Sequence, residues 1–184
     1  MTTQIDGLRF EPYELPKSLA PLRAQVRDFL RTECTKFTAV HRSNSWDAYD
    51  AEFSRKLGER GWLGMTLPKA YGGHERGPLE RYVVVEEILA AGAPAGFHWI
   101  ADRQSGPLLA RYGTEAQKNT ILPRITRGEV CFCIGMSEPN SGSDLASLRT
   151  RAERTDAGWL ITGQKIWTSH AHQAHYMIAL FRTS

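Results

Sequence analysis

Residues 133–144 read CIGMSEPNSGSD, and this stretch decides more about the fold than any other part of the chain. It begins as an apolar, strand-like segment and continues into a compact loop with glycine, serines and two carboxylates, Glu138 and Asp144. Small residues after a strand let backbone amides approach a bound anion or a heteroaromatic ring closely. The alternative is a Gly/Ser turn in which Asp144 caps the helical turn that follows. From the residue chemistry alone, both interpretations stay open.

A second unusual segment, GQKIWTSH, follows at residues 163–170 and places Trp167 beside two hydroxyl side chains, Thr168 and Ser169. A flavin requires one stacked ring face and hydrogen bonds at its polar edge, and this triplet offers both. The alternative is a tryptophan that packs in the core at the end of a strand. The chain has five tryptophans, so Trp167 stands out only through its neighbours.

The composition is that of an ordinary globular protein. The 184 residues are 41% hydrophobic and 23% charged, which fits one domain, or one domain and part of another. The formal charge of +3 is small and the basic residues are scattered, so no nucleic-acid partner is expected. No apolar run reaches the ~18 residues of a membrane span, and no signal peptide is visible. The three cysteines are interpreted as buried thiols in a reducing cytoplasm, and no metal site is expected.

The pattern of the sequence changes near Gly128, which predicts an α+β fold with segregated parts. A helical domain is expected over residues 1–128 and a β domain over residues 129–184. The predicted helices lie at residues 18–37, from an N-cap at Ser45 to Gly61, at 78–91, at 96–112, and from a capping box at 114–117 to Gly128 with an interruption at Pro123. The predicted strands lie at residues 130–136, in a hairpin of 149–155 and 159–162, and at 176–182. The last strand would lack partners, so the β domain is expected to be cut short.

Together, the two segments resemble the middle-domain signature of the acyl-CoA dehydrogenase family, whose members bind FAD. The pattern Met-Ser-Glu-Pro-x-x-Gly-Ser-Asp, followed by Gly-x-Lys-x-Trp-x-Ser, is similar to that family in order and spacing. The segments YGTEAQK at 112–118 and YGG at 71–73 match as well, as does Glu86-Glu87. The resemblance covers the chain from about Phe53 onward. It implies an all-helical N-terminal domain followed by the start of a β-barrel-like domain, truncated relative to the family.

The resemblance also implies a set of cofactor-binding residues on the two segments: Ile134, Met136, Ser137, Gly142, Ser143, Trp167, Thr168 and Ser169. The first three would meet the flavin ring, where the Ser137 hydroxyl would bond the pyrimidine end. Gly142 and Ser143 would meet the FAD phosphates, and Ser143 would also meet the bound acyl-CoA. Trp167 would pack on the ring, and Ser169 would hydrogen-bond near its N5 atom.

Some residues depart from the family pattern. Ile134 stands where an aromatic residue is often found, and His170 stands where a small residue or asparagine is usual. Ser137 and Ser169 replace the commoner threonine and keep its hydroxyl.

Other side chains invite a catalytic interpretation. Glu138 and Asp144 could form an acid and base pair, but the resemblance implies that they orient the loop. The histidines that could act as bases or ligands are His98, His170, His172 and His175. The resemblance assigns them no role, and we expect them at surface or packing positions.

The family oxidises the Cα–Cβ bond of an acyl-CoA thioester, using a carboxylate base from a C-terminal helical domain. The chain resembles the N-terminal portion of such an FAD-dependent enzyme of lipid metabolism, so it is expected to hold no catalytic residue and to be inactive alone. The expected partners are acyl-CoA, an electron-transfer flavoprotein or similar acceptor, and either further copies in a dimer or tetramer or a paired subunit, in the cytoplasm. The alternatives are a related flavoenzyme of the acyl-CoA oxidase or nitroalkane oxidase type, or a non-catalytic half that binds a partner subunit.

Overall fold

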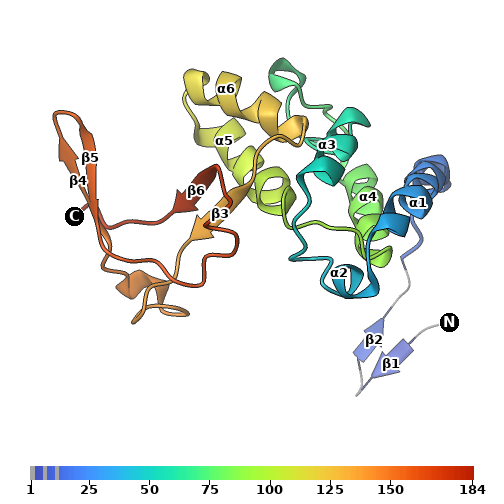
Figure 1. Ribbon diagram of the computed structural model, residues 1–184, viewed down its shortest axis with the longest axis horizontal. Helices are drawn as coiled ribbons and strands as arrows, with labels where there is room; N and C mark the ends of the chain where they lie inside the picture. The colour runs from blue at the N-terminus through green and yellow to red at the C-terminus, as the bar shows by residue number, and fades with distance from the viewer. Residues whose placement is uncertain (1–2, 6–7, 11–12) are drawn as a thin grey trace.

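The chain folds into a helical part followed by a part that contains strands (Figure 1). The computed structural model describes residues 3–5, 8–10 and 13–184. The helices are α1 (Ala20–Glu33), α2 (Ala39–Ser43), α3 (Ala51–Glu59), α4 (Pro78–Ala90), α5 (Gly106–Tyr112) and α6 (Glu115–Thr126). The strands are β1 (Thr3–Ile5), β2 (Leu8–Phe10), β3 (Phe132–Gly135), β4 (Arg151–Thr155), β5 (Gly158–Thr162) and β6 (Tyr176–Ala179). This order confirms the predicted α+β class.

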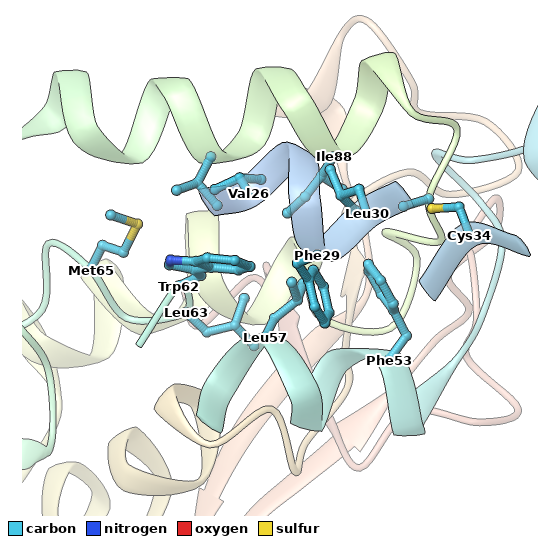
Figure 2. Close-up of a cluster of buried hydrophobic side chains, with 12 residues drawn as sticks. Val26, Phe29, Leu30, Cys34, Phe53, Leu57, Trp62, Leu63, Met65 and Ile88 are labelled. Carbon is cyan, nitrogen blue, oxygen red and sulfur yellow. The ribbon is translucent and has the colours of Figure 1, made fainter. Parts of the chain in front are cut away.

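The first core lies between α1, α3 and α4 (Figure 2). Val26 and Leu30 of α1, Phe53 and Leu57 of α3, and Ile88 of α4 are each at most 3% exposed. Full burial of one such side chain is worth about 1.5–3 kcal/mol. The apolar residues of α1 recur at helical spacing, which is why the sequence pattern predicted this helix.

A charged contact also joins α1 to α4. Glu87 is buried, and it accepts hydrogen bonds from Arg27 Nε at 2.7 Å and from the Arg23 guanidinium. Burial raises the pKa of Glu87, but the two guanidinium groups outweigh burial and hold that pKa below its usual value. The carboxylate therefore stays charged inside the helix pair.

A second core joins the helical part to the strands. Leu122 and Ile125 of α6 pack in one cluster with Val130 and Phe132. Between them the chain turns at Gly128, where φ is 67° and an added Cβ would lie 2.2 Å from the Ser54 carbonyl oxygen. Only glycine fits this turn. This cluster contains residues from both sides of Gly128. The expected division into two domains at this residue stays a prediction.

The predicted start of α3 at Ser45 is wrong. The N-cap is Asp50, whose side chain accepts a hydrogen bond from the Phe53 amide at 2.7 Å. Ser45 Oγ instead donates to the Ala93 carbonyl at 2.5 Å. Aspartate and serine cap helices about equally well, so local sequence preference did not distinguish the two positions.

The predicted interruption of α6 at Pro123 is also wrong, although its capping box is confirmed. Thr114 and Gln117 bond each other reciprocally, at 3.2 Å and 2.9 Å, as a capping box does. The helix then runs through Pro123 to Thr126. Burial of Leu122 and Ile125 on either side of the proline offsets the hydrogen bond that its ring removes.

The strands after α6 form two pairs, one between neighbours in the chain and one between strands far apart in it. β4 and β5 make the predicted antiparallel hairpin, whose turn is Asp156-Ala157. β3 pairs in parallel with β6, with Ile134 opposite Ile178, so the expectation that the last strand would lack partners is wrong. In Figure 1 the β4–β5 hairpin extends away from the helices, while β3 and β6 lie closer to them. The long connection between β3 and β6 holds both segments that the sequence singled out.

The antiparallel pairing of β1 with β2 was not predicted, and it places Ile5 opposite Leu8. Among residues 3–5, 8–10 and 13–184, no helix has both the length and the apolar character of a membrane span.

Candidate functional site

Two loops that are separated in the sequence meet in the structure. The serine loop (residues 137–144) follows β3, and the tryptophan loop (residues 163–170) follows β5. The Ile166 amide donates a hydrogen bond to the Ser137 carbonyl at 2.9 Å. Lys165 Nζ donates to the Met136 carbonyl at 3.0 Å. The two segments singled out in the sequence therefore lie side by side.

Glu138 anchors the serine loop. Its Oε1 accepts hydrogen bonds from Lys165 Nζ at 2.8 Å and from the Thr150 amide at 2.9 Å, and its Oε2 accepts one from the Arg149 amide at 2.6 Å. The side chains of Glu138 and Lys165 are each 8% exposed. One carboxylate therefore joins the serine loop, the tryptophan loop and the segment that leads into β4.

These donors also decide the protonation of Glu138. Hydrogen bonds from Lys165, from Thr150 and from the Arg149 amide lower the pKa of Glu138 to about 2. A group with so low a pKa is a poor proton acceptor near neutral pH. Glu138 is therefore suited to hold the loop, as expected, and poorly suited to act as a general base.

Asp144 contributes to the loop through its backbone. Its carbonyl accepts hydrogen bonds from Ser141 Oγ and Ser147 Oγ, both at 2.8 Å. Asp144 precedes the short turn Leu145–Ser147, but its side chain makes no capping hydrogen bond to the residues that the structure describes. The alternative in which the Asp144 carboxylate caps this turn is therefore wrong for the described residues.

Gly142 and Ser143 form an exposed part of the serine loop. A Cβ added at Gly142 would meet no described atom of the chain within 4 Å. Packing within this part of the chain therefore does not require glycine, whereas close approach of a ligand to the backbone would. Together with the exposed Ser143 hydroxyl, this open backbone fits a bound phosphate.

The tryptophan loop presents Trp167 outward. Trp167 is 87% exposed, and its φ of 56° is a left-handed conformation that is uncommon for a residue other than glycine. Thr168 beside it is half-buried, and Ser169 is exposed. The alternative that Trp167 packs in the core is therefore wrong for the described chain. An exposed indole next to hydroxyl groups fits one face and one edge of a flavin ring.

Ile134 and Met136 lie where β3 leads into the serine loop. Both are half-buried, whereas Phe132, Cys133 and Gly135 are buried. Ser137, also half-buried, continues this less buried row to the contact with Ile166. An apolar row that ends in a hydroxyl fits a flavin ring with one polar edge.

The histidines take varied positions. His98 is buried with Nδ1 2.8 Å from Ser54 Oγ, and burial lowers its pKa to about 4. His175 Nδ1 accepts a hydrogen bond from the Cys131 amide at 3.1 Å, and His172 is exposed. These three histidines occupy the packing and surface positions that were expected. The fourth, His170, reaches Asp47 of the helical part.

The three cysteines are buried and free, as interpreted from the sequence. Burial raises the pKa of the Cys131 thiol to about 11, so it is unreactive near neutral pH. In the part of the chain that the structure describes, no group of three or more His, Cys, Asp or Glu side chains is placed to hold a metal ion.

The sequence interpretation missed the role of Lys165. This residue stands in the quoted motif, but no function was expected for it. The sequence did contain a signal for this contact. Glu138 is acidic and Lys165 is basic, and they stand in two loops that were expected to share a ligand. The donors of Arg149 and Thr150 are backbone amides, which no side-chain pattern reveals.

Two family models match the chain. The model described as "Acyl-CoA dehydrogenase, N-terminal domain" matches residues 17–129, and "Acyl-CoA dehydrogenase, middle domain" matches residues 133–184. The chain therefore belongs to the acyl-CoA dehydrogenase family. It corresponds to the N-terminal portion of these proteins.

A curated relative shows how much of the family's length the chain represents. Acyl-CoA dehydrogenase FadE26 of Mycobacterium tuberculosis is 34% identical over 176 residues, which cover 91% of this chain and 44% of the relative. The chain thus spans less than half the length of this relative.

Solved structures give the same picture. The Tcur3481-Tcur3483 steroid ACAD is 39% identical with a TM-score of 0.81, and the match covers 93% of this chain and 44% of that one. The ChsE4-ChsE5 complex from Mycobacterium tuberculosis is 34% identical with a TM-score of 0.80, covering 95% and 44%. A glutaryl-CoA dehydrogenase from Mycobacterium smegmatis in complex with FADH2 is 27% identical with a TM-score of 0.78, covering 92% and 44%.

Proposed function

We propose that the protein to which this chain belongs is an FAD-dependent acyl-CoA dehydrogenase that oxidises the Cα–Cβ bond of an acyl-CoA thioester. The observation that carries the proposal is the meeting of the serine and tryptophan loops through Glu138, Lys165 and the Ile166 amide. Family membership supports the activity. The FADH2 named with the similar glutaryl-CoA dehydrogenase supports the cofactor.

In this proposal the two loops hold different parts of FAD. The residues proposed at the flavin ring are Ile134, Met136, Ser137, Trp167, Thr168 and Ser169. Gly142 and Ser143 would bind the phosphates, and Ser143 would also contact the acyl-CoA. Bound FAD supplies the hydride acceptor that this oxidation needs. The Glu138–Lys165 pair fixes the loops before the cofactor binds, which reduces the entropy lost on binding.

We assign removal of the substrate's α-proton to a residue outside this chain. A general base works best when its pKa lies near the working pH. The pKa of about 2 for Glu138 is far below neutral, and three donors already occupy its oxygens. The 184 residues would therefore supply the cofactor wall and depend on another segment or subunit for the base.

The test is to purify the protein at its full length, measure flavin absorbance per chain, and follow reduction of a dye acceptor. Straight-chain, branched and steroid-derived acyl-CoA thioesters serve as the substrate panel. We expect stoichiometric FAD and acyl-CoA-dependent dye reduction, with poor FAD binding by residues 1–184 alone. A colourless full-length protein would contradict the proposal. Rapid hydrogen peroxide formation with oxygen would favour the oxidase alternative.

A second possibility is that a different subunit supplies the base and the rest of the flavin site. The similarity to a structure named as the ChsE4-ChsE5 complex favours it. Size measurement of the purified protein, alone and coexpressed with the product of an adjacent reading frame, distinguishes a homo-oligomer from a paired subunit. An electron-transfer flavoprotein as acceptor and a cytoplasmic location stay predictions.

A further inference from the structure

The tryptophan loop has an unusual backbone on both sides of its hydroxyl pair. Trp167 and His170 both have a left-handed backbone conformation, with φ of 56° and 60°. In the described chain only one other residue besides glycine, Glu75, has a positive φ. Such conformations persist when the surroundings hold them in place. Thr168 and Ser169 therefore lie between two strained positions, and some contact must stabilise them.

The side chain of His170 lies in a seat formed by three residues of the helical part: Asp47, Tyr49 and Gly96. His170 Nε2 is 3.1 Å from Asp47 Oδ1, and its ring centroid is 5.5 Å from that of Tyr49. At this distance the Asp47 carboxylate would form an ion pair with a protonated His170 ring, although the two groups are not aligned as a hydrogen bond. A Cβ added at Gly96 would lie 2.8 Å from Nε2. Glycine therefore leaves the room that the ring occupies.

The seat is held together by contacts within the helical part. The Gly96 amide donates a hydrogen bond to the Ala48 carbonyl at 2.9 Å. Tyr49 packs edge-to-face on Phe97, with ring centroids 5.1 Å apart. The seat can therefore act as a fixed reference for the tryptophan loop.

We propose that His170 is a positioning residue that fixes Trp167, Thr168 and Ser169 against the helical part, in the arrangement that receives the flavin. This inference rests on the proposed function. The turn that follows is held separately, since the His170 carbonyl accepts hydrogen bonds from the Gln173 and Ala174 amides at 2.9 Å. The ring is therefore not needed for that turn, and its contacts act on the position of the loop.

The same geometry argues against a role for His170 as a free base. Its side chain is 11% exposed, and Nε2 is buried against the helical part rather than open to a ligand. Any effect of this residue on flavin binding would therefore pass through its neighbours in the tryptophan loop.

The experiment uses the full-length protein and four variants: His170→Asn, Asp47→Asn, the double variant, and His172→Asn as a matched control on an exposed histidine of the same segment. Asparagine tolerates a left-handed backbone, so His170→Asn removes the ring without adding strain. The FAD dissociation constant is measured for each variant. Visible circular dichroism of the bound flavin reports the surroundings of its ring, and the melting temperature of the apoprotein detects a folding defect.

We expect His170→Asn to weaken FAD binding about threefold to tenfold, because the loop loses both the packing of the ring and its contact with the Asp47 carboxylate. Asp47→Asn should weaken it about twofold to threefold, and the double variant should match His170→Asn alone because the two residues act as a pair. Both single variants should alter the flavin dichroism, while His172→Asn and all apoprotein melting temperatures stay at the wild-type values.

Wild-type affinity and dichroism in both His170→Asn and Asp47→Asn would overturn the inference. If His170→Asn does not fold, Asp47→Asn decides by the same two readouts. A wild-type protein that binds no FAD would contradict the proposed function and this inference together. Wild-type FAD binding in every variant would contradict the role of His170 alone.

Discussion

The core between α1, α3 and α4 and the two loops of the candidate site are ordered by different interactions. In the core, apolar side chains such as Phe53 and Leu57 are completely buried. In the loops, the order comes from polar contacts around Glu138 and Lys165, while Trp167 stays 87% exposed. The core is therefore suited to supply stability, and the loops are suited to supply contact surface for a ligand.

This difference predicts that mutations in the core and mutations in the loops have different effects. A cavity in the core should lower the free energy of unfolding and leave the flavin affinity of the folded molecules unchanged. A change to an exposed loop side chain such as Trp167 should lower the flavin affinity and leave the free energy of unfolding unchanged.

Leu57→Ala should lower the free energy of unfolding by about 2–5 kcal/mol, since Leu57 is fully buried and its loss leaves a cavity. Urea unfolding of the apoprotein measures the change. Leu108→Ala is the matched control, because Leu108 is 41% exposed and should cost much less. Molecules of Leu57→Ala that remain folded should bind FAD with wild-type affinity, and a weakened affinity would show that the core also shapes the flavin site.

Mild acid should weaken the helical part before it affects the Glu138 anchor. Burial lowers the pKa of His98 to about 4, so the unfolded chain takes up a proton first as the pH falls. The stability from neutral His98 is present above about pH 6.5 and is lost towards about pH 4, by about 2 kcal/mol between about pH 7 and about pH 5.

The stability from ionised Glu138 is present above the ordinary glutamate pKa of about 4.3 and is lost only as the pH falls towards its folded pKa of about 2. Urea unfolding at several pH values tests the order of these two losses. His98→Gln should remove most of the loss above about pH 5. An unchanged pH dependence in that variant would show that another group is responsible.

Trp167→Ala should weaken FAD binding by about 0.5–1.5 kcal/mol, the value of aromatic stacking beyond buried area. Trp159→Ala is the control within the strands: Trp159 lies on β5, is 58% exposed, and is not among the proposed flavin contacts. Equal FAD dissociation constants for the two variants would refute the assignment of Trp167.

The helices with a clear apolar pattern could be predicted from the sequence, but their boundaries could not always be. The period of Val26, Phe29 and Leu30 predicted α1, and the turn at Asp156 predicted the β4–β5 hairpin. The start of α3 at Asp50 was missed because Ser45 offers an equally good cap in the sequence. The local sequence therefore predicts that a helix or strand is present, whereas tertiary contacts determine which of several similar residues begins or ends it.

The candidate site divides in the same way. The residue types of both loops could be read from the sequence, and the resemblance assigned them to a flavin. The parallel pairing of β3 with β6 joins segments far apart in the chain, as do the backbone donors to Glu138 and the contact of His170 with Asp47. Such contacts depend on the folded arrangement and leave no periodic signal.

The most direct test of the account is the Glu138→Gln variant of the full-length protein, because it asks whether this residue anchors the loops or acts as the base. The measurements are FAD content, turnover per bound flavin, and deuterium exchange at the substrate α-carbon. We predict reduced FAD content, with turnover per bound flavin and α-proton exchange close to wild type. Loss of a true general base would lower the rate about 10²–10⁴-fold. A variant that keeps its full complement of FAD but exchanges no α-proton would contradict the account.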